Sequence, residues 1–236
     1  MKRLVFDIEC VAEDWDSFDQ MTKDSLTRYA RDVARDEADL EHGIEQVKHE
    51  LVFSPLTSRI IAIGVYDIDE KRGAVYYDAA DTTPEDVEED GIKYAAMSEA
   101  DMLTKFWTLA EISDEFVSFY GRGNDVPFLM VRSAVHHIRP TKDLISNRYN
   151  SSRMPGAIHY DLYDLLTFFG ASRKKGSLHM WCRAFGIDSP KRGELDGSKV
   201  GQAYADGKYL DIARYNVNDL RATASLFEYW DRYLRF

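Results

Sequence analysis

The feature that most constrains the fold is an alternation of residue types close to the N-terminus. In residues 2–10 the apolar residues Leu4, Phe6 and Ile8 alternate with Val5, Asp7 and Glu9. A period of two predicts a β-strand with the apolar side chains on one face and both carboxylates on the other. The apolar face predicts a core. The acidic face predicts either a solvated surface or a site for a cation.

The rest of the chain alternates between strand and helix patterns. Period-two apolar runs predict further strands at residues 58–67, 73–78, 116–120 and 158–160. Polar, proline-free sequence predicts helices at residues 17–36 and 39–51, and an amphipathic pattern predicts one at 98–110. Further helices are expected to begin near residue 125, to follow the strand at 158–160 through residue 169, and to span 177–185 and 209–235. The acidic stretch 79–97 is expected to be a loop. This order predicts one α/β domain over residues 1–236, with a helical insertion at about 13–50.

Charge is distributed unevenly along the chain. The formal net charge is −11, and residues 13–50 carry twelve acidic side chains against five basic ones. Residues 141–192 reverse the balance, with nine basic side chains against four acidic ones. A polyanionic partner therefore remains possible despite the net charge, while the acidic stretches are equally compatible with solvated faces.

Several classes of protein are disfavoured by the composition. No apolar run approaches the length of a membrane span, and the short N-terminal apolar run does not fit a signal peptide, so we expect a cytoplasmic protein. The two cysteines, Cys10 and Cys182, provide neither a disulfide framework nor zinc-site spacing.

Three further residues could complete a chemical site with Asp7 and Glu9. Asp125 follows a glycine-rich turn at the start of a predicted helix, where an aspartate is commonly a simple cap. Tyr215 and Asp219 are one helical turn apart and share a face of the last helix. Each of these signals is weak alone, because a cap or a solvated acid explains it equally well.

In combination the motifs are more specific. Three short segments contain these acids, in this order along the chain: Phe-Asp-Ile-Glu with Asp7 and Glu9, Asn-Asp-Val-Pro-Phe-Leu with Asp125, and Tyr-Asn-Val-Asn-Asp with Tyr215 and Asp219. Their order resembles the DEDD exonuclease superfamily, which has a ribonuclease-H-like fold with a central mixed sheet flanked by helices. The tyrosine four residues before Asp219 resembles the tyrosine subclass, since the histidine subclass would carry its histidine at the position of Arg214.

More narrowly, the chain is similar to stand-alone 3′–5′ exonucleases related to the proofreading domain of family B DNA polymerases. Segments 159–162, 195–200 and 212–215 support this, and the resemblance spans residues 1–10 and 58–232. Two positions depart from that family, which commonly has asparagine and phenylalanine where this chain has Tyr120 and Asn124. The departures leave the acids intact and put contacts to the terminal nucleotides in doubt.

The resemblance implies an activity and a cofactor. It implies that Asp7, Glu9, Asp125 and Asp219 bind two divalent cations, Mg²⁺ or Mn²⁺, and that Tyr215 orients the attacking water. Oxygen ligands suit such hard cations. The implied substrate is single-stranded DNA, shortened from its 3′ end to release nucleoside 5′-monophosphates. Asp161 is either an outer support of this site or the N-cap of a helix.

Contacts to a nucleic acid would need cations and exposed rings. The candidate cations for phosphate binding are Arg122, Arg173, Lys174, Lys175, Lys191 and Arg192. We expect the aromatic side chains of Tyr163, Phe168, Phe169 and Trp181 to lie in the core rather than to stack on bases.

Two other functions remain open at this point. An RNA 3′–5′ exonuclease of the ribonuclease D type would use the same metal chemistry. A catalytically silent module that binds nucleic acid or a protein is the alternative of another class. Retention of all four acids and the tyrosine favours an enzyme.

Overall fold

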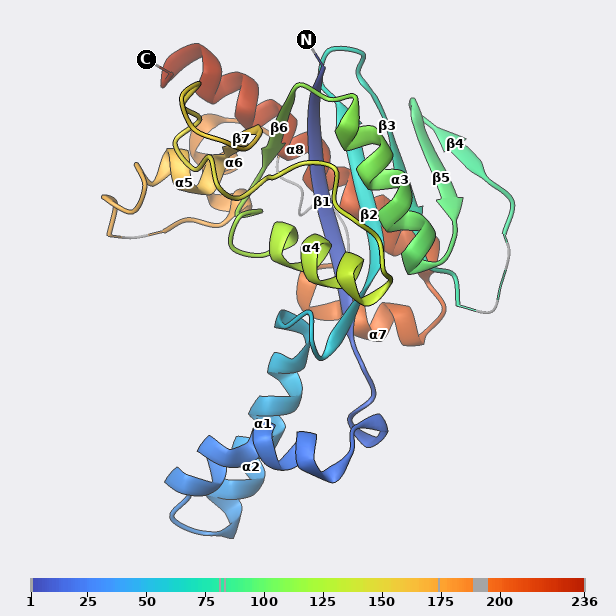
Figure 1. Cartoon of the computed structure of the whole chain (residues 1–236), viewed down its shortest axis with the longest axis vertical. Coiled ribbons are helices and arrows are strands. Elements are labelled where there is room, and N and C mark those ends of the chain that lie inside the picture. The colour runs from blue at the N-terminus through green and yellow to red at the C-terminus, as the bar shows by residue number, and fades with distance from the viewer. Residues whose placement is uncertain (1, 81, 83, 174, 189–194, 236) are drawn as a thin grey trace.

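The computed structural model describes residues 2–80, 82, 84–173, 175–188 and 195–235. Within them, a seven-stranded sheet runs in the order β4-β5-β3-β2-β1-β6-β7 (Figure 1). β1 pairs with β2 in antiparallel and with β6 in parallel orientation, so the sheet is mixed. The strands are β1 (Arg3–Ala12), β2 (Ser58–Asp67), β3 (Arg72–Tyr77), β4 (Val87–Glu89), β5 (Ile92–Ala96), β6 (Glu115–Ser118) and β7 (Ile158–Asp161). The predicted α/β fold with a central mixed sheet is confirmed.

Helices cover both faces of this sheet. Leu4, Phe6 and Ile8 of β1 join one core cluster, which includes residues of α3 (Glu99–Glu111) and α4 (Asp125–Val135). Val5 joins a second cluster on the opposite face, with α5 (Leu162–Leu166) and the long α8 (Tyr209–Tyr233). The period of two in β1 therefore separates two cores. Smaller elements are η1 (Trp15–Ser17), η2 (Leu51–Phe53), α6 (Leu178–Phe185), η3 (Gly197–Lys199) and α7 (Val200–Ala205). Among the described residues, no helix combines the length and apolarity that a membrane crossing requires.

A helical pair lies between β1 and β2. It consists of α1 (Gln20–Val33) and α2 (Glu37–Glu50), at the positions that the polar pattern predicts. Ala12 and Ser58 are neighbours across the two antiparallel strands, so the pair replaces what could be a short hairpin turn. Figure 1 shows it standing away from the sheet. We call residues 13–53 the helical hairpin.

The expected acidic loop at 79–97 is wrong in its second half. That segment contains β4 and β5, and β5 pairs in parallel with β3. Ile92 and Tyr94 are buried while Lys93 between them is exposed, which is the alternation of a strand at the sheet surface. The acidic residues before Ile92 hid this short apolar alternation.

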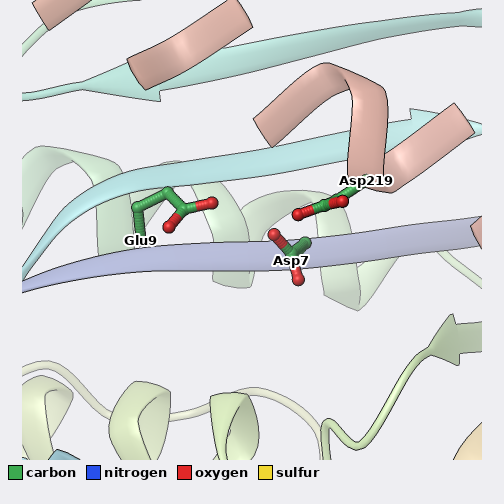
Figure 2. Close-up of side chains that lie close together, drawn as sticks. All are labelled: Asp7, Glu9 and Asp219. Carbon is green, nitrogen blue, oxygen red and sulfur yellow. The ribbon is translucent and has the colours of Figure 1, made fainter. Parts of the chain in front are cut away.

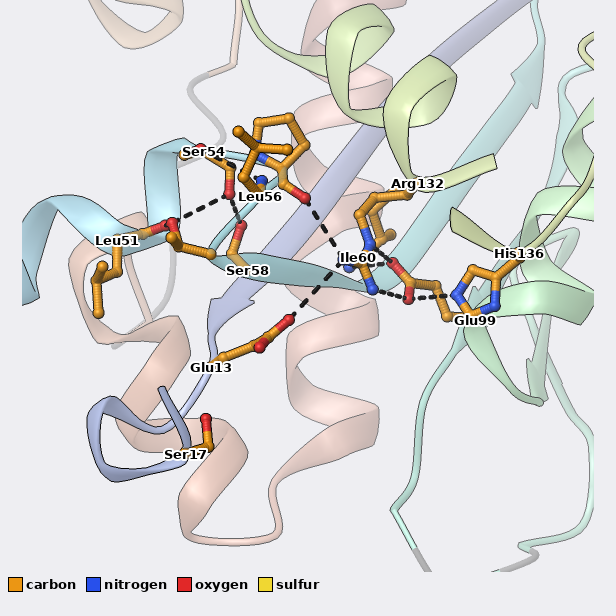
Figure 3. A network of polar contacts seen from close by, with 12 residues as sticks. Glu13, Ser17, Leu51, Ser54, Leu56, Ser58, Ile60, Glu99, Arg132 and His136 are labelled. Atoms are coloured by element: carbon orange, nitrogen blue, oxygen red, sulfur yellow. Dashed lines mark hydrogen bonds and ion pairs between the residues drawn. The ribbon is translucent and has the colours of Figure 1, made fainter. Parts of the chain in front are cut away.

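One buried ion pair connects α3, α4 and β2 (Figure 3). The Glu99 carboxylate accepts hydrogen bonds from Arg132 Nε at 2.9 Å and from the Ile60 backbone N–H at 2.8 Å. Its second oxygen accepts from Arg132 at 2.8 Å and contacts His136 Nε2 at 2.8 Å. Burial alone would raise the pKa of Glu99, but these hydrogen bonds outweigh it and hold the pKa below its ordinary value. The pair thereby fixes α4, which begins with Asp125, against β2.

We predict that Glu99→Ala strongly destabilises the fold. The change leaves a buried guanidinium and a buried backbone N–H without their acceptor, which typically costs about 3–5 kcal/mol. Denaturant unfolding measures the loss. Arg35→Ala is the control, because it removes an ion pair whose Arg35 side chain is 84% exposed, and the free energy of unfolding should stay within error of wild type. Equal stabilities for the two variants would contradict the assignment.

Candidate active site

Three carboxylates from the two ends of the chain meet on one face of the sheet. Asp7 and Glu9 project from β1 and Asp219 projects from α8, which lies over that strand (Figure 2). One oxygen of each carboxylate lies within 4.8 Å of an oxygen of each of the other two. The predicted sharing of a face by Asp7 and Glu9 is confirmed by this arrangement.

The close approach of α8 depends on a glycine in β2. Gly64 is paired with Asp7, and a Cβ at this position would lie 1.8 Å from Asn216 Oδ1 and 2.7 Å from a methyl group of Leu220. Any larger residue would therefore displace the side chains of Asn216 and Leu220 from their positions against β2. In the resulting contact, Asn216 Nδ2 donates a hydrogen bond to Asp7 Oδ2 at 2.7 Å. Sequence reasoning missed Gly64 and Asn216, although Asn216 lies inside the Tyr-Asn-Val-Asn-Asp motif.

Asp125 lies beside this cluster but not within it. It opens α4, is only 3% exposed, and accepts a hydrogen bond from the Ile8 N–H at 3.1 Å through Oδ1. Ile8 lies between Asp7 and Glu9, so this bond fixes Asp125 against the acidic segment of β1. The four acids predicted from sequence are thus brought to one region by β1, α4 and α8.

The acids are electrostatically strained without a cation. Burial raises the pKa of Asp7 well above its ordinary value, and the charges of Asp125, Glu9 and Asp219 raise it further. Burial, followed by the charge of Asp219, raises the pKa of Glu9 in the same way. Burial raises the pKa of Asp125 to about 7, against the opposing effect of its backbone hydrogen bonds. Hard divalent cations would offset this repulsion, and an all-oxygen donor set fits them.

Tyr215 lies one turn before Asp219 on the same helix. Burial and the Asp219 charge raise the pKa of its phenol, so the hydroxyl is protonated near neutral pH. A Cβ added to Gly197 would lie 3.9 Å from the Tyr215 hydroxyl oxygen, which puts the η3 segment next to this group. The phenol can therefore donate a hydrogen bond beside the carboxylates but cannot act as a base.

Comparison with known proteins decides the family. A family model described as a predicted 3′–5′ exonuclease related to the exonuclease domain of PolB matches residues 55–233. The chain belongs to this family. The match begins after β1, so the positions of Asp7 and Glu9 rest on the geometry alone. No protein of curated function matches the sequence.

The fold of this exonuclease-family chain also occurs in a solved polymerase. The chain resembles the family B DNA polymerase from the hyperthermophilic archaeon Pyrobaculum calidifontis, with a TM-score of 0.59 and 17% sequence identity. The likeness covers 97% of this chain and 24% of the polymerase, so the chain spans about a quarter of that protein's length. The predicted ribonuclease-H-like fold and the predicted relation to polymerase exonucleases are confirmed at this level.

Two of the candidate residues have their polar groups engaged within the protein. Asp161 is the N-cap of α5, and its carboxylate accepts backbone N–H bonds from Tyr120, Arg122 and Tyr163. The Arg122 guanidinium donates to four backbone carbonyls, those of Leu144, Ile145, Asn147 and His159. Both residues therefore shape the turn that leads to Asp125. The four acceptors occupy the Arg122 guanidinium, which argues against the predicted phosphate contact at this residue.

The remaining basic candidates divide into two groups. Arg173 and Lys175 are exposed, and the Lys175 ammonium lies 5.5 Å from the centre of the Tyr163 ring. Lys174, Lys191 and Arg192 lie outside the described residues.

The expectation that four aromatic residues lie in the core is wrong for two of them. Tyr163 and Trp181 are half-buried, but Phe168 is 58% exposed and Phe169 is 39% exposed. Helix α5 ends at Leu166, and the backbone at Phe168 and Phe169 then adopts positive φ angles of 51° and 55°. This conformation, rare for residues other than glycine, ends the helix and leaves both rings outside the core.

The raised carboxyl pKa values predict the effect of Asp7→Asn on metal-free protein. An acid whose pKa is raised on folding destabilises the fold as pH increases above its unfolded value, because the folded state holds the proton longer. The variant should therefore melt a few degrees above wild type at about pH 8, and the difference should be smaller near pH 5. For a chain of this size, each kcal/mol of stability shifts the melting temperature by roughly 2–4 °C.

Thermal melts in chelator measure this difference. Glu111→Gln, which neutralises an exposed acid at the end of α3, should melt with wild type at both pH values. An Asp7→Asn variant that is less stable than wild type at pH 8 would show that the cluster is not repulsive.

Proposed function

We propose that this chain is a metal-dependent 3′–5′ exonuclease of the tyrosine subclass of the DEDD superfamily. Its substrate is DNA with a single-stranded 3′ end, and its products are nucleoside 5′-monophosphates. Residues 1–236 act as one exonuclease domain with the helical hairpin inserted. The observation that supports this most is the convergence of Asp7, Glu9 and Asp219 within 4.8 Å, next to the buried Asp125.

The four acids would hold two divalent cations, Mg²⁺ or Mn²⁺. In this proposal Asp7 would contribute to both sites, Glu9 and Asp219 to one, and Asp125 to the other. Two such ions supply an activated water and stabilise the leaving oxygen of a phosphodiester. Asn216 positions the Asp7 carboxylate through its 2.7 Å hydrogen bond, and Gly64 leaves room for the Asn216 side chain that makes this bond.

Tyr215 positions the attacking water in this proposal. Its protonated hydroxyl can hydrogen-bond to the water or to the scissile phosphate. Arg173 and Lys175, with Lys174, Lys191 and Arg192, are the proposed phosphate contacts of the incoming strand.

The function is tested with 5′-labelled single-stranded DNA and RNA of equal sequence in Mg²⁺. We predict a ladder that shortens from the 3′ end of DNA, with nucleoside 5′-monophosphates as products and inhibition by a 3′-phosphate. Asp7→Asn should abolish the ladder, while Glu111→Gln should leave it unchanged. Rapid cutting of circular single-stranded DNA would identify an endonuclease instead. Digestion of RNA alone would favour the ribonuclease D type.

Tyr215→Phe removes one hydroxyl and keeps the ring. The loss of one positioning hydrogen bond should lower kcat roughly ten- to a thousandfold, by comparison with removal of single transition-state contacts. Calorimetric titration with Mn²⁺ should give the same affinity as wild type, because the phenol is not a metal ligand. A wild-type kcat would restrict Tyr215 to packing.

A further inference from the structure

A cavity of about 720 Å³ opens beside Glu9, and one of its walls belongs to the helical hairpin. The body of the domain supplies Ile8 to Ala12 of β1, Asn124 and Phe128 around the start of α4, and Gly197, Ser198, Val200 and Gly201. The end of the hairpin supplies the remaining lining residues, namely Lys48, His49, Val52 and Phe53. A volume of this size is within the range of small-molecule sites and has room for one nucleotide.

The cavity borders the candidate active site. Glu9 is part of its wall, and Gly197, which also lines it, is the residue whose added Cβ would lie 3.9 Å from the Tyr215 hydroxyl. A group bound there would therefore be adjacent to both a carboxylate of the acidic cluster and the phenol.

The hairpin is attached so that its base is fixed at this cavity. Leu51 of η2 is 4% exposed, and its carbonyl accepts a 2.7 Å hydrogen bond from Thr57 Oγ1. Ser58 Oγ donates to the Ser54 carbonyl at 2.5 Å, which closes the same turn onto β2. Two residues from the buried Leu51, the Phe53 ring is 73% exposed. A firmly held segment thus leaves a large apolar ring in solvent at the mouth of the cavity.

The chemistry of the walls fits a nucleotide. Glu9 supplies a carboxylate, and Val52, Phe53, Phe128 and Val200 provide apolar surface. Lys48 supplies a cation, and its ion pair with Glu45 at 2.6 Å is solvent-exposed, so a phosphate can replace the carboxylate at little cost. Aromatic rings stack on nucleobases with little regard to base identity, and an ammonium group suits a phosphate.

We infer that the helical hairpin is a substrate-binding element that forms the outer wall of the site for the terminal nucleotide. Phe53 stacks on the terminal base and Lys48 faces its phosphate or that of the next nucleotide. This inference rests on the proposed exonuclease function, and it gives the insertion between β1 and β2 a role in holding the end of the strand.

The test combines kinetics on single-stranded DNA with binding of thymidine 5′-monophosphate in the presence of Mg²⁺. Phe53→Ala should raise KM and weaken monophosphate binding roughly ten- to a hundredfold with a smaller change in kcat, because stacking on a base is sequence-tolerant and strong. Phe53→Trp should restore the wild-type KM and the wild-type affinity for the monophosphate. Lys48→Ala should also raise KM and weaken monophosphate binding. Tyr29→Ala, which removes a 78% exposed ring on α1 away from the cavity, should match wild type.

The two proposals fail in different ways in this experiment. If wild type hydrolyses DNA and Phe53→Ala matches Tyr29→Ala in KM and in monophosphate affinity, the inference about the hairpin is overturned while the exonuclease function stands. If wild type hydrolyses neither DNA nor RNA but binds the monophosphate in a Phe53-dependent way, the nucleotide site stands and the proposed activity falls. Absence of both hydrolysis and binding overturns both.

Discussion

The contact of α8 with β1 and β2 is the interaction on which the candidate site depends. Asp7 and Asp219 are more than 200 positions apart in sequence, and they meet only because the helix lies directly over the two strands. The missing side chain at Gly64 makes room for Asn216 and Leu220, and Asn216 then bonds to Asp7. The metal-binding geometry that we propose is therefore a consequence of backbone packing.

The same packing concentrates buried negative charge, which lowers the free energy of unfolding. Burial and mutual repulsion raise the carboxyl pKa values of Asp7 and Glu9, so the ionised cluster opposes folding until a cation is bound. Elsewhere a charge cluster is fully paired, as at Glu99 with Arg132 and His136.

 In this second cluster the Arg132 guanidinium neutralises the Glu99 carboxylate. The cluster fixes α4 against β2. The domain thus combines a neutralised ion pair that stabilises it with an unneutralised cluster of carboxylates that is available to a cation.

Much of the site could be predicted from sequence because its parts obey local rules. The period of two in β1 puts Asp7 and Glu9 on one face, and the helical spacing of four puts Tyr215 and Asp219 on another. The order of the motifs then indicates the family. None of these rules gives the distance between β1 and α8, which depends on Gly64 and Asn216 in elements that are far apart in sequence.

The errors have similar physical causes. Arg122 looks like a free cation in sequence, but the loop at 144–147 folds back and supplies carbonyl acceptors for it. Phe168 and Phe169 continue an apolar helix pattern, but the chain turns into positive φ after Leu166. β5 is hidden by neighbouring acids, although burial alternates over its first three residues, Ile92, Lys93 and Tyr94. In each case a tertiary contact or a backbone turn overrides the local pattern.

The central claim is that the four acids bind a pair of divalent cations, and a crystal soaked in MnCl₂ tests it most directly. Anomalous difference maps should show two peaks about 3.5–4 Å apart, bounded by Asp7, Glu9, Asp125 and Asp219. Crystals of Asp7→Asn, soaked in the same way, should lose both peaks or retain one at reduced occupancy. A wild-type map with no peak at these carboxylates, at a manganese concentration that labels other sites, would contradict the account.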